Sequence, residues 1–129
     1  MIFVDSNVPM YLVGRPHPNR DRVASFIRFN VAETFVTSAE IYQEVIHRYI
    51  AIDRRSSIAD CFAFLDSLVQ YVYPITKEDV SRARTIAEMQ KRLSGRDCLH
   101  IATMERHGIE RILSCDEDFD LWSGFTRLP

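Results

Sequence analysis

Carboxylates follow two apolar segments of this 129-residue chain. Asp5 comes directly after Ile2–Val4, and Asp116 comes directly after Arg111–Cys115. Both segments predict strands of an α/β sheet, in which ligands bind outside the carboxyl ends of the strands. Asp97 begins a predicted helix whose C-terminal end leads into the strand Arg111–Cys115. Each acid alone could simply cap a helix or a turn, but two acids at one sheet edge favour a shared site.

The segment Ala39–Ile52 adds a fourth candidate acid. Its apolar stripe, which includes Val45 and Tyr49, predicts an amphipathic helix. At about 100° per residue, Glu40 falls roughly opposite this stripe and Glu44 lies about 40° nearer to it. We therefore expect Glu44 to face the site and Glu40 to be solvated near the helix N-terminus, where negative charge is mildly favourable.

Mutual repulsion decides what four converging carboxylates can do. At separations of ~8 Å and an effective dielectric constant near 20, each charged pair costs about 2 kcal/mol. Such a cluster requires either protonated carboxyl groups or a divalent cation, and an all-oxygen set suits Mg²⁺ or Mn²⁺ rather than zinc. Mg²⁺ keeps several waters when it is bound this way, as hydrolysis of a phosphodiester by metal-activated water requires.

Cysteine and histidine offer weaker alternatives. Cys98, His100 and Cys115 lack the paired spacing of a zinc site, and helix periodicity places the first two on different faces. We expect His47, His100 and His107 to be packed or surface side chains rather than catalytic bases. The three cysteines of the chain are too few for a disulfide framework.

The chain lacks an acid that each of two other classes of acidic site requires. A phosphoaspartyl hydrolase needs a second Asp two residues after Asp5, where this chain has Asn7. A phosphorelay receiver domain normally has adjacent acids after its first strand, and that pair is also missing.

The elements that position these acids alternate along the chain. Strands separated by single helices or helix pairs predict an α/β sheet covered by helices, in one domain over residues 1–129. The expected strands are Ile2–Val4, Thr34–Thr37, Tyr71–Tyr73, Arg111–Cys115 and an edge strand in Phe125–Leu128. The expected helices are Asn7–Val13, Arg20–Phe29, Ala39–Ile52, Ile58–Val69, Thr76 to about Leu93, and Asp97–Arg106, the last ended by Gly108.

Charge and hydropathy restrict the partners. The chain has 16 basic and 18 acidic residues, a formal charge of −2, so it lacks the overall basic charge of proteins that bind nucleic acid mainly through charge. No apolar run approaches the ~20 residues of a membrane span, and the N-terminus has no secretory signal, so we expect a cytoplasmic protein. Two bound Mg²⁺ would change the formal charge from −2 to +2.

Arginine dominates the basic residues, at 14 of 16, and its guanidinium suits bidentate phosphate contacts. Arg15, Arg20 and Arg22 lie in or just after the loop behind the first helix, and Arg92 and Arg96 precede Asp97. These groups could flank the site and hold the phosphates of a nucleic-acid backbone, although scattered solubilising charge explains any one of them equally well.

Aromatic side chains on the helix pair between residues 41 and 69 exceed the needs of one small core. They are Tyr42, Tyr49, Phe62 and Phe64. We expect most of them to pack in the core and the surplus to form a groove for a partner protein or the contact of a homodimer.

Four motifs together resemble those of PIN-domain ribonucleases, and most closely those of VapC-type toxins. They are Asp5-Ser6-Asn7 after an apolar strand, the helix from Ser38 through Glu44-Val45, the run Arg96 to Ala102, and the run Ser114 to Phe119. The resemblance spans nearly the whole chain in order. It implies a three-layer α/β/α fold with a mainly parallel sheet of four or five strands, an Mg²⁺- or Mn²⁺-dependent endoribonuclease activity, and a cognate antitoxin that blocks the site.

The resemblance also assigns residues by position. The acidic quartet corresponds to Asp5, Glu44, Asp97 and Asp116, with Asp118 as a further acid. Small polar residues that support the acids correspond to Ser6, Asn7 and Ser114. The leading hypothesis is a metal-dependent endoribonuclease acting as the toxin of a toxin–antitoxin pair, and the alternative is a non-catalytic module of the same fold that binds RNA or protein.

Overall fold

The computed structural model describes all 129 residues and has a central sheet of five parallel strands. Their order across the sheet is β3-β2-β1-β4-β5, so the first strand lies in the middle. The strands are β1 (Ile2–Val4), β2 (Phe35–Ser38), β3 (Tyr71–Tyr73), β4 (Arg111–Leu113) and β5 (Thr126–Leu128). Parallel neighbours require crossover connections, and the helices supply them, which confirms the predicted α/β class.

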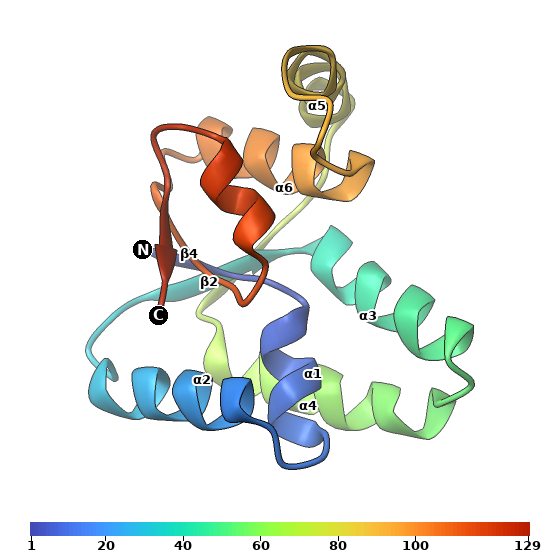
Figure 1. Ribbon diagram of the computed structural model, residues 1–129, viewed down its shortest axis with the longest axis vertical. Coiled ribbons are helices and arrows are strands. Elements are labelled where there is room, and N and C mark those ends of the chain that lie inside the picture. The colour runs from blue at the N-terminus through green and yellow to red at the C-terminus, as the bar shows by residue number, and fades with distance from the viewer.

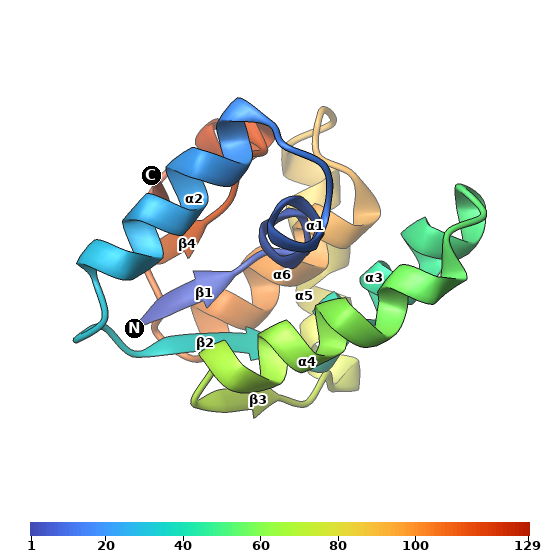
Figure 2. The ribbon, with the colours of Figure 1, turned by 90° about the horizontal axis from the view of Figure 1, so that it is seen from below.

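Helices cover both faces of the sheet. In Figure 1, α1, α2 and α4 lie below the strands and α5 and α6 lie above them, and Figure 2 shows the lower three in front of the strands. The helices are α1 (Asn7–Val13), α2 (Pro18–Phe29), α3 (Ala39–Ala51), α4 (Ile58–Leu68), α5 (Lys77–Met89) and α6 (Gly95–Arg106), with the 3₁₀ turns η1 (Arg55–Ser57) and η2 (Glu117–Leu121). The arrangement is the expected three-layer α/β/α sandwich.

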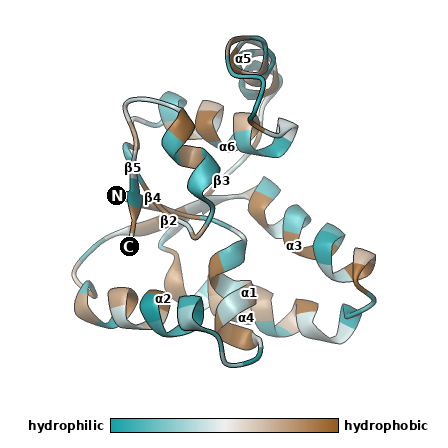
Figure 3. Ribbon diagram, viewed as in Figure 1, coloured by the Kyte–Doolittle hydropathy of each residue, from teal (hydrophilic) through white to brown (hydrophobic).

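The core surrounds the central strand β1 and its two neighbours, β2 and β4. All three residues of β1 are buried, as expected for a strand covered on both faces. A smaller cluster of Val45, Tyr49 and Cys61 joins α3 to α4. Figure 3 shows hydrophobic and hydrophilic turns alternating along α3, as an amphipathic helix requires.

The aromatic side chains of α3 and α4 pack against other side chains of the same chain. Tyr49 is buried, and Tyr42, Phe62 and Phe64 pack partly buried against the two clusters. The surplus apolar surface expected there is therefore small. The large hydrophobic side chains that are exposed in this region are Ile50 and Ile52, at the end of α3.

Strand β4 ends at Leu113, two residues before the predicted Cys115, so Ser114 and Cys115 separate it from Asp116. Three helix boundaries also differ from the sequence predictions by two residues or more. Helix α2 begins at Pro18 instead of Arg20, because the His17 side chain accepts a hydrogen bond from the Asn19 amide and caps the helix. Helix α5 ends at Met89, four residues earlier than expected. Helix α6 begins at Gly95 instead of Asp97, because the Ser94 hydroxyl accepts a hydrogen bond from the Asp97 amide at 3.1 Å.

Two further features follow the sequence. Gly108 follows the C-cap residue of α6, His107, and takes a φ of +65°, the left-handed conformation expected of a residue that ends a helix. The three cysteines are free. None of the helices combines the length and the apolar character needed to span a membrane.

Candidate active site

Asp5 lies at the carboxyl end of the central strand, where the chain leaves the sheet. Only 4% of its surface is exposed. Its carboxylate accepts hydrogen bonds from the Ser6 amide at 2.7 Å, from Asn7 Nδ2 at 3.1 Å and from Ser114 Oγ at 2.6 Å. Burial raises the pKa of Asp5 above its ordinary value, although the charge of His100 and the hydrogen bond from Ser114 act in the opposite direction.

Asn7 connects the ends of β1 and β4. Its Nδ2 donates to Asp5 and to Ser114 Oγ, both at 3.1 Å, and its Oδ1 accepts a hydrogen bond from the Cys115 amide at 3.2 Å. Ser114 Oγ also accepts from the Asp116 amide at 3.0 Å. The polar side chains of Asn7 and Ser114 therefore fix Asp5 relative to the loop that carries Asp116. The Ser6 hydroxyl, by contrast, is buried and has no hydrogen-bond partner.

Asp97 enters the site from the first turn of α6. It is 8% exposed, and its backbone amide is held by Ser94. Burial, together with the negative charges of Asp5 and Asp116, raises the pKa of Asp97 to about 6. An acid whose neighbours disfavour its ionised form this strongly is a candidate for a functional group, because a bound cation would reverse the effect.

Asp116 and Asp118 lie at the start of η2. Asp116 Oδ1 accepts a hydrogen bond from the Asp118 amide at 2.9 Å. Each of Asp97, Asp116 and Asp118 offers an oxygen that lies within 4.8 Å of those of the other two. Asp97 is buried, Asp116 is half-buried and Asp118 is exposed, so this trio opens to solvent on one side. Three oxygen donors at this spacing suit a hard divalent cation such as Mg²⁺ or Mn²⁺.

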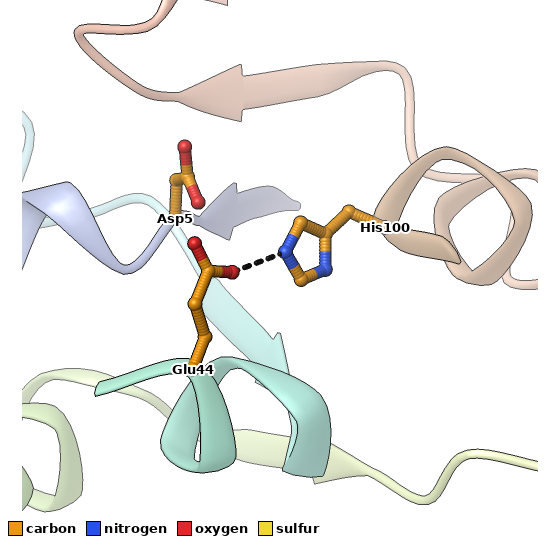
Figure 4. Close-up of side chains that lie close together, drawn as sticks. All are labelled: Asp5, Glu44 and His100. Atoms are coloured by element: carbon orange, nitrogen blue, oxygen red, sulfur yellow. Dashed lines mark hydrogen bonds and ion pairs between the residues drawn. The ribbon is translucent and has the colours of Figure 1, made fainter. Parts of the chain in front are cut away.

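Glu44 approaches the acids from α3, as helical periodicity predicted. Its Oε2 atom lies 2.8 Å from Nε2 of His100. Figure 4 shows the Asp5 and Glu44 carboxylates beside each other, with the imidazole to their right and joined to Glu44. Burial disfavours the charged form of Glu44, but the hydrogen bond and the charge of His100 outweigh it and lower the pKa of Glu44. Glu40, expected to be solvated, is partly buried and lies 3.9 Å from the Arg96 guanidinium.

His100 is the site residue that the sequence analysis missed. It is completely buried, and its ligand atom lies within 4.8 Å of those of Asp5 and Glu44. Burial lowers the pKa of a histidine, but the Glu44 hydrogen bond and the charges of Asp5, Glu44 and Asp97 outweigh it and raise the pKa of His100. The available signal was its position three residues after Asp97, which places both side chains on one face of α6.

The acids line a cavity of about 330 Å³ that contains no hydrophobic side chain. Of the five arginines expected near the site, only Arg96 lines this cavity. Arg15 lines a neighbouring larger cavity, and Arg92 is exposed and lines neither. The acidic cavity is lined by Asp5, Asn7, Glu44, His47, Arg48, Ser94, Arg96, Asp97, Asp116 and Asp118.

Comparisons with known proteins agree with this geometry. Residues 2–122 match the PIN domain family. Ribonuclease VapC13 of Mycobacterium tuberculosis is 44% identical over 130 residues, which cover 99% of each chain.

Solved structures share the fold. The crystal structure of Mycobacterium tuberculosis VapC20, described as a sarcin-ricin loop cleaving toxin, superposes with a TM-score of 0.80 at 20% identity, over 98% of this chain and 97% of that one. A toxin–antitoxin complex from Klebsiella pneumoniae gives a TM-score of 0.66 at 17% identity, over 98% and 96% of the two chains. On the strength of the family match and of the identity with VapC13, this chain belongs to the PIN-domain family and, within it, to the VapC ribonucleases.

Proposed function

We propose that this protein is a divalent-cation-dependent endoribonuclease whose catalytic groups are Asp5, Glu44, Asp97 and Asp116. The observation that carries the proposal is the carboxylate trio of Asp97, Asp116 and Asp118 beside the buried Asp5 and Glu44. Membership of the VapC ribonucleases supports the substrate class.

The residues divide into two groups by their environment. Asp97, Asp116 and Asp118 would hold Mg²⁺ or Mn²⁺, because they open to solvent and repel one another. When bound, the cation supplies an acidified water as the nucleophile and positive charge for the phosphorane-like transition state. Asp5 and Glu44 lie deeper, where Asn7, Ser114 and His100 fix their carboxylates against the trio.

We also propose that a cognate antitoxin restrains this activity in the cell. Support comes from the family, in which a structural neighbour from Klebsiella pneumoniae is a toxin–antitoxin complex. An antitoxin must cover or distort the acidic cavity to inhibit, and the arginines at its rim, Arg48 and Arg96, are natural contacts for acidic groups of a partner.

The test is cleavage of a structured RNA by the purified protein with Mg²⁺ or Mn²⁺ and with EDTA. We expect cleavage with either cation, none with EDTA, and a loss of at least 100-fold in Asp97→Asn and Asp116→Asn. Glu88→Gln is the matched control, because Glu88 is an exposed acid of α5 that pairs only with Arg84. Cleavage that is indifferent to EDTA or survives in both Asn variants contradicts the proposal, and RNA binding without cleavage identifies a non-catalytic module.

A further inference from the structure

A second cavity of about 790 Å³ adjoins the acidic one. It lies between α1, α3 and η1, and its volume is in the range of small-ligand sites. Asn7, Arg48 and Asp116 line both cavities, so the two form one continuous depression. A chain that passes through the acidic cavity therefore has room to continue into the larger one.

The rim of this larger cavity is basic. Arg15, Arg48 and Arg54 line it, against a single carboxylate, that of Asp116. Arg15 and Arg54 form no ion pair in the structure, and the guanidinium of Arg48 approaches only Glu44, at 3.9 Å. Guanidinium groups without protein partners are available for phosphate oxygens, which they bind in bidentate geometry.

The floor of the cavity is apolar and aromatic. Met10, Val13 and Tyr49 line it and belong to the small core cluster between α1, α3 and α4. The Tyr49 hydroxyl accepts a hydrogen bond from the buried Cys61 thiol, which fixes its ring. Tyr11 is half-buried, lines the same cavity and packs its ring 5.0 Å from that of His17. Aromatic rings in a basic groove are the usual means of holding unpaired bases.

We propose that this cavity binds the nucleotide adjacent to the scissile phosphate, with its base on the Tyr11 side of the floor and its phosphate on Arg15 and Arg54. The inference rests on the proposed ribonuclease function and deepens it. A base can enter the cavity only when it is unpaired, because the bases of an A-form duplex are stacked inside the helix. The nucleotide that occupies this cavity must therefore be unpaired.

Binding without cleavage separates this subsite from the catalytic acids. The fluorescence anisotropy of a labelled, unstructured oligoribonucleotide is measured with the full-length protein in EDTA. We expect the Kd to rise about tenfold in Tyr11→Ala, and much less in Tyr11→Phe, which keeps the ring. Arg54→Gln should raise the Kd and also reduce the slope of log K against log salt by about 1.

The matched control is Arg55→Gln, because Arg55 is exposed on the same turn and lines neither cavity. It should change the Kd less than twofold, and an RNA duplex should bind at least tenfold more weakly than the single strand. Unchanged Kd values in Tyr11→Ala and Arg54→Gln overturn the proposal and favour a protein segment as the ligand of the cavity. Cleavage in Mg²⁺ is scored separately: cavity-dependent binding without cleavage overturns only the ribonuclease function, and Asp97-dependent cleavage with unchanged Kd values overturns only the subsite.

Discussion

His100 Nε2 lies 2.8 Å from Glu44 Oε2 (Figure 4), and this pair joins α6 to α3 at a residue of α3 that lines the acidic cavity. The two residues are 56 positions apart in the chain, and the imidazole is completely buried. The second ring nitrogen, Nδ1, is buried without a hydrogen-bond partner. His100 therefore has one polar contact, with Glu44, and that contact orients the carboxylate toward Asp5.

Replacement of His100 by alanine should lower the cleavage rate by roughly 10- to 100-fold, the range usual for groups that orient metal-binding residues. The RNA Kd should not change, because His100 does not reach the surface. His100→Gln keeps an N–H donor and should recover part of the rate. Single-turnover cleavage and anisotropy measure the two quantities, and equal rates in the Ala and Gln variants would show that His100 only fills space.

The pKa of Asp97, about 6 in the folded protein against 3.8 for a free side chain, predicts a pH dependence of stability without metal. Between these pH values the folded state binds more protons than the unfolded state, so the free energy of unfolding falls as the pH rises from about 4 to 6. A shift of this size corresponds to roughly 3 kcal/mol. Asp97→Asn removes the charge and should stabilise the metal-free protein by a similar amount at pH 8.

Urea denaturation of both proteins in EDTA at pH 4 and pH 8 tests this expectation. The advantage of Asp97→Asn should nearly vanish at pH 4, where the native aspartate is protonated. Added Mn²⁺ should stabilise the wild type and reverse the order at pH 8. A variant that is less stable than the wild type in EDTA at pH 8 would instead give Asp97 a structural role as a helix-start acid.

The positions of Asp5 and Asp116 could be predicted from the sequence because strand ends in a parallel sheet meet at one edge. The apolar runs before them marked the strands, and both acids line the acidic cavity. The face of α3 that carries Glu44 followed from helical periodicity. These inferences need only local patterns and one rule of topology.

Other parts of the site depend on packing between distant elements. His100 becomes a site residue only because α3 brings Glu44 against it, and a buried histidine looks the same in sequence whether or not it has such a partner. The sequence could not tell which arginines line the site, because a flexible side chain lines whichever cavity the helices leave beside it: Arg96 lines the acidic cavity, Arg15 the larger one and Arg92 neither. The early start of α2 depends on a His17 cap, and histidine is not among the common capping residues.

Asp79 and Arg106 should hold α6, and therefore Asp97, against α5. Arg106 Nε lies 2.6 Å from Asp79 Oδ1, and its terminal nitrogen lies 3.0 Å from Oδ2. Burial disfavours the Asp79 carboxylate, but hydrogen bonds from Arg106 and Thr76 outweigh it and lower the pKa of Asp79. Because Asp79 is 1% exposed, Arg106→Gln should cost ~2–3 kcal/mol by leaving a buried charge without its partner.

This stabilisation requires the ionised form of Asp79, so it is fully present above the ordinary aspartate pKa of about 4 and is lost as the pH falls through the lowered value. The control is Arg82→Gln, which breaks the more exposed pair with Glu105 and should cost under ~1 kcal/mol. Thermal unfolding at pH 7 measures both. Equal losses in the two variants would show that burial of Asp79 does not matter.

Ser114 should be needed for activity because its hydroxyl connects three parts of the site. It donates to Asp5 at 2.6 Å and accepts from Asn7 and from the Asp116 amide. Ser114→Ala removes all three hydrogen bonds and leaves the Asp116 amide without its partner, which should cost about 1–2 kcal/mol of stability. Because Asp5 then loses its shortest hydrogen bond, cleavage should fall about tenfold at saturating Mg²⁺.

Ser38→Ala is the matched control, since the Ser38 hydroxyl is equally buried, forms no hydrogen bond and lines neither cavity. It should leave the melting temperature and the cleavage rate nearly unchanged, and similar losses in the two variants would mean that the size of the side chain, not its hydrogen bonds, matters at Ser114.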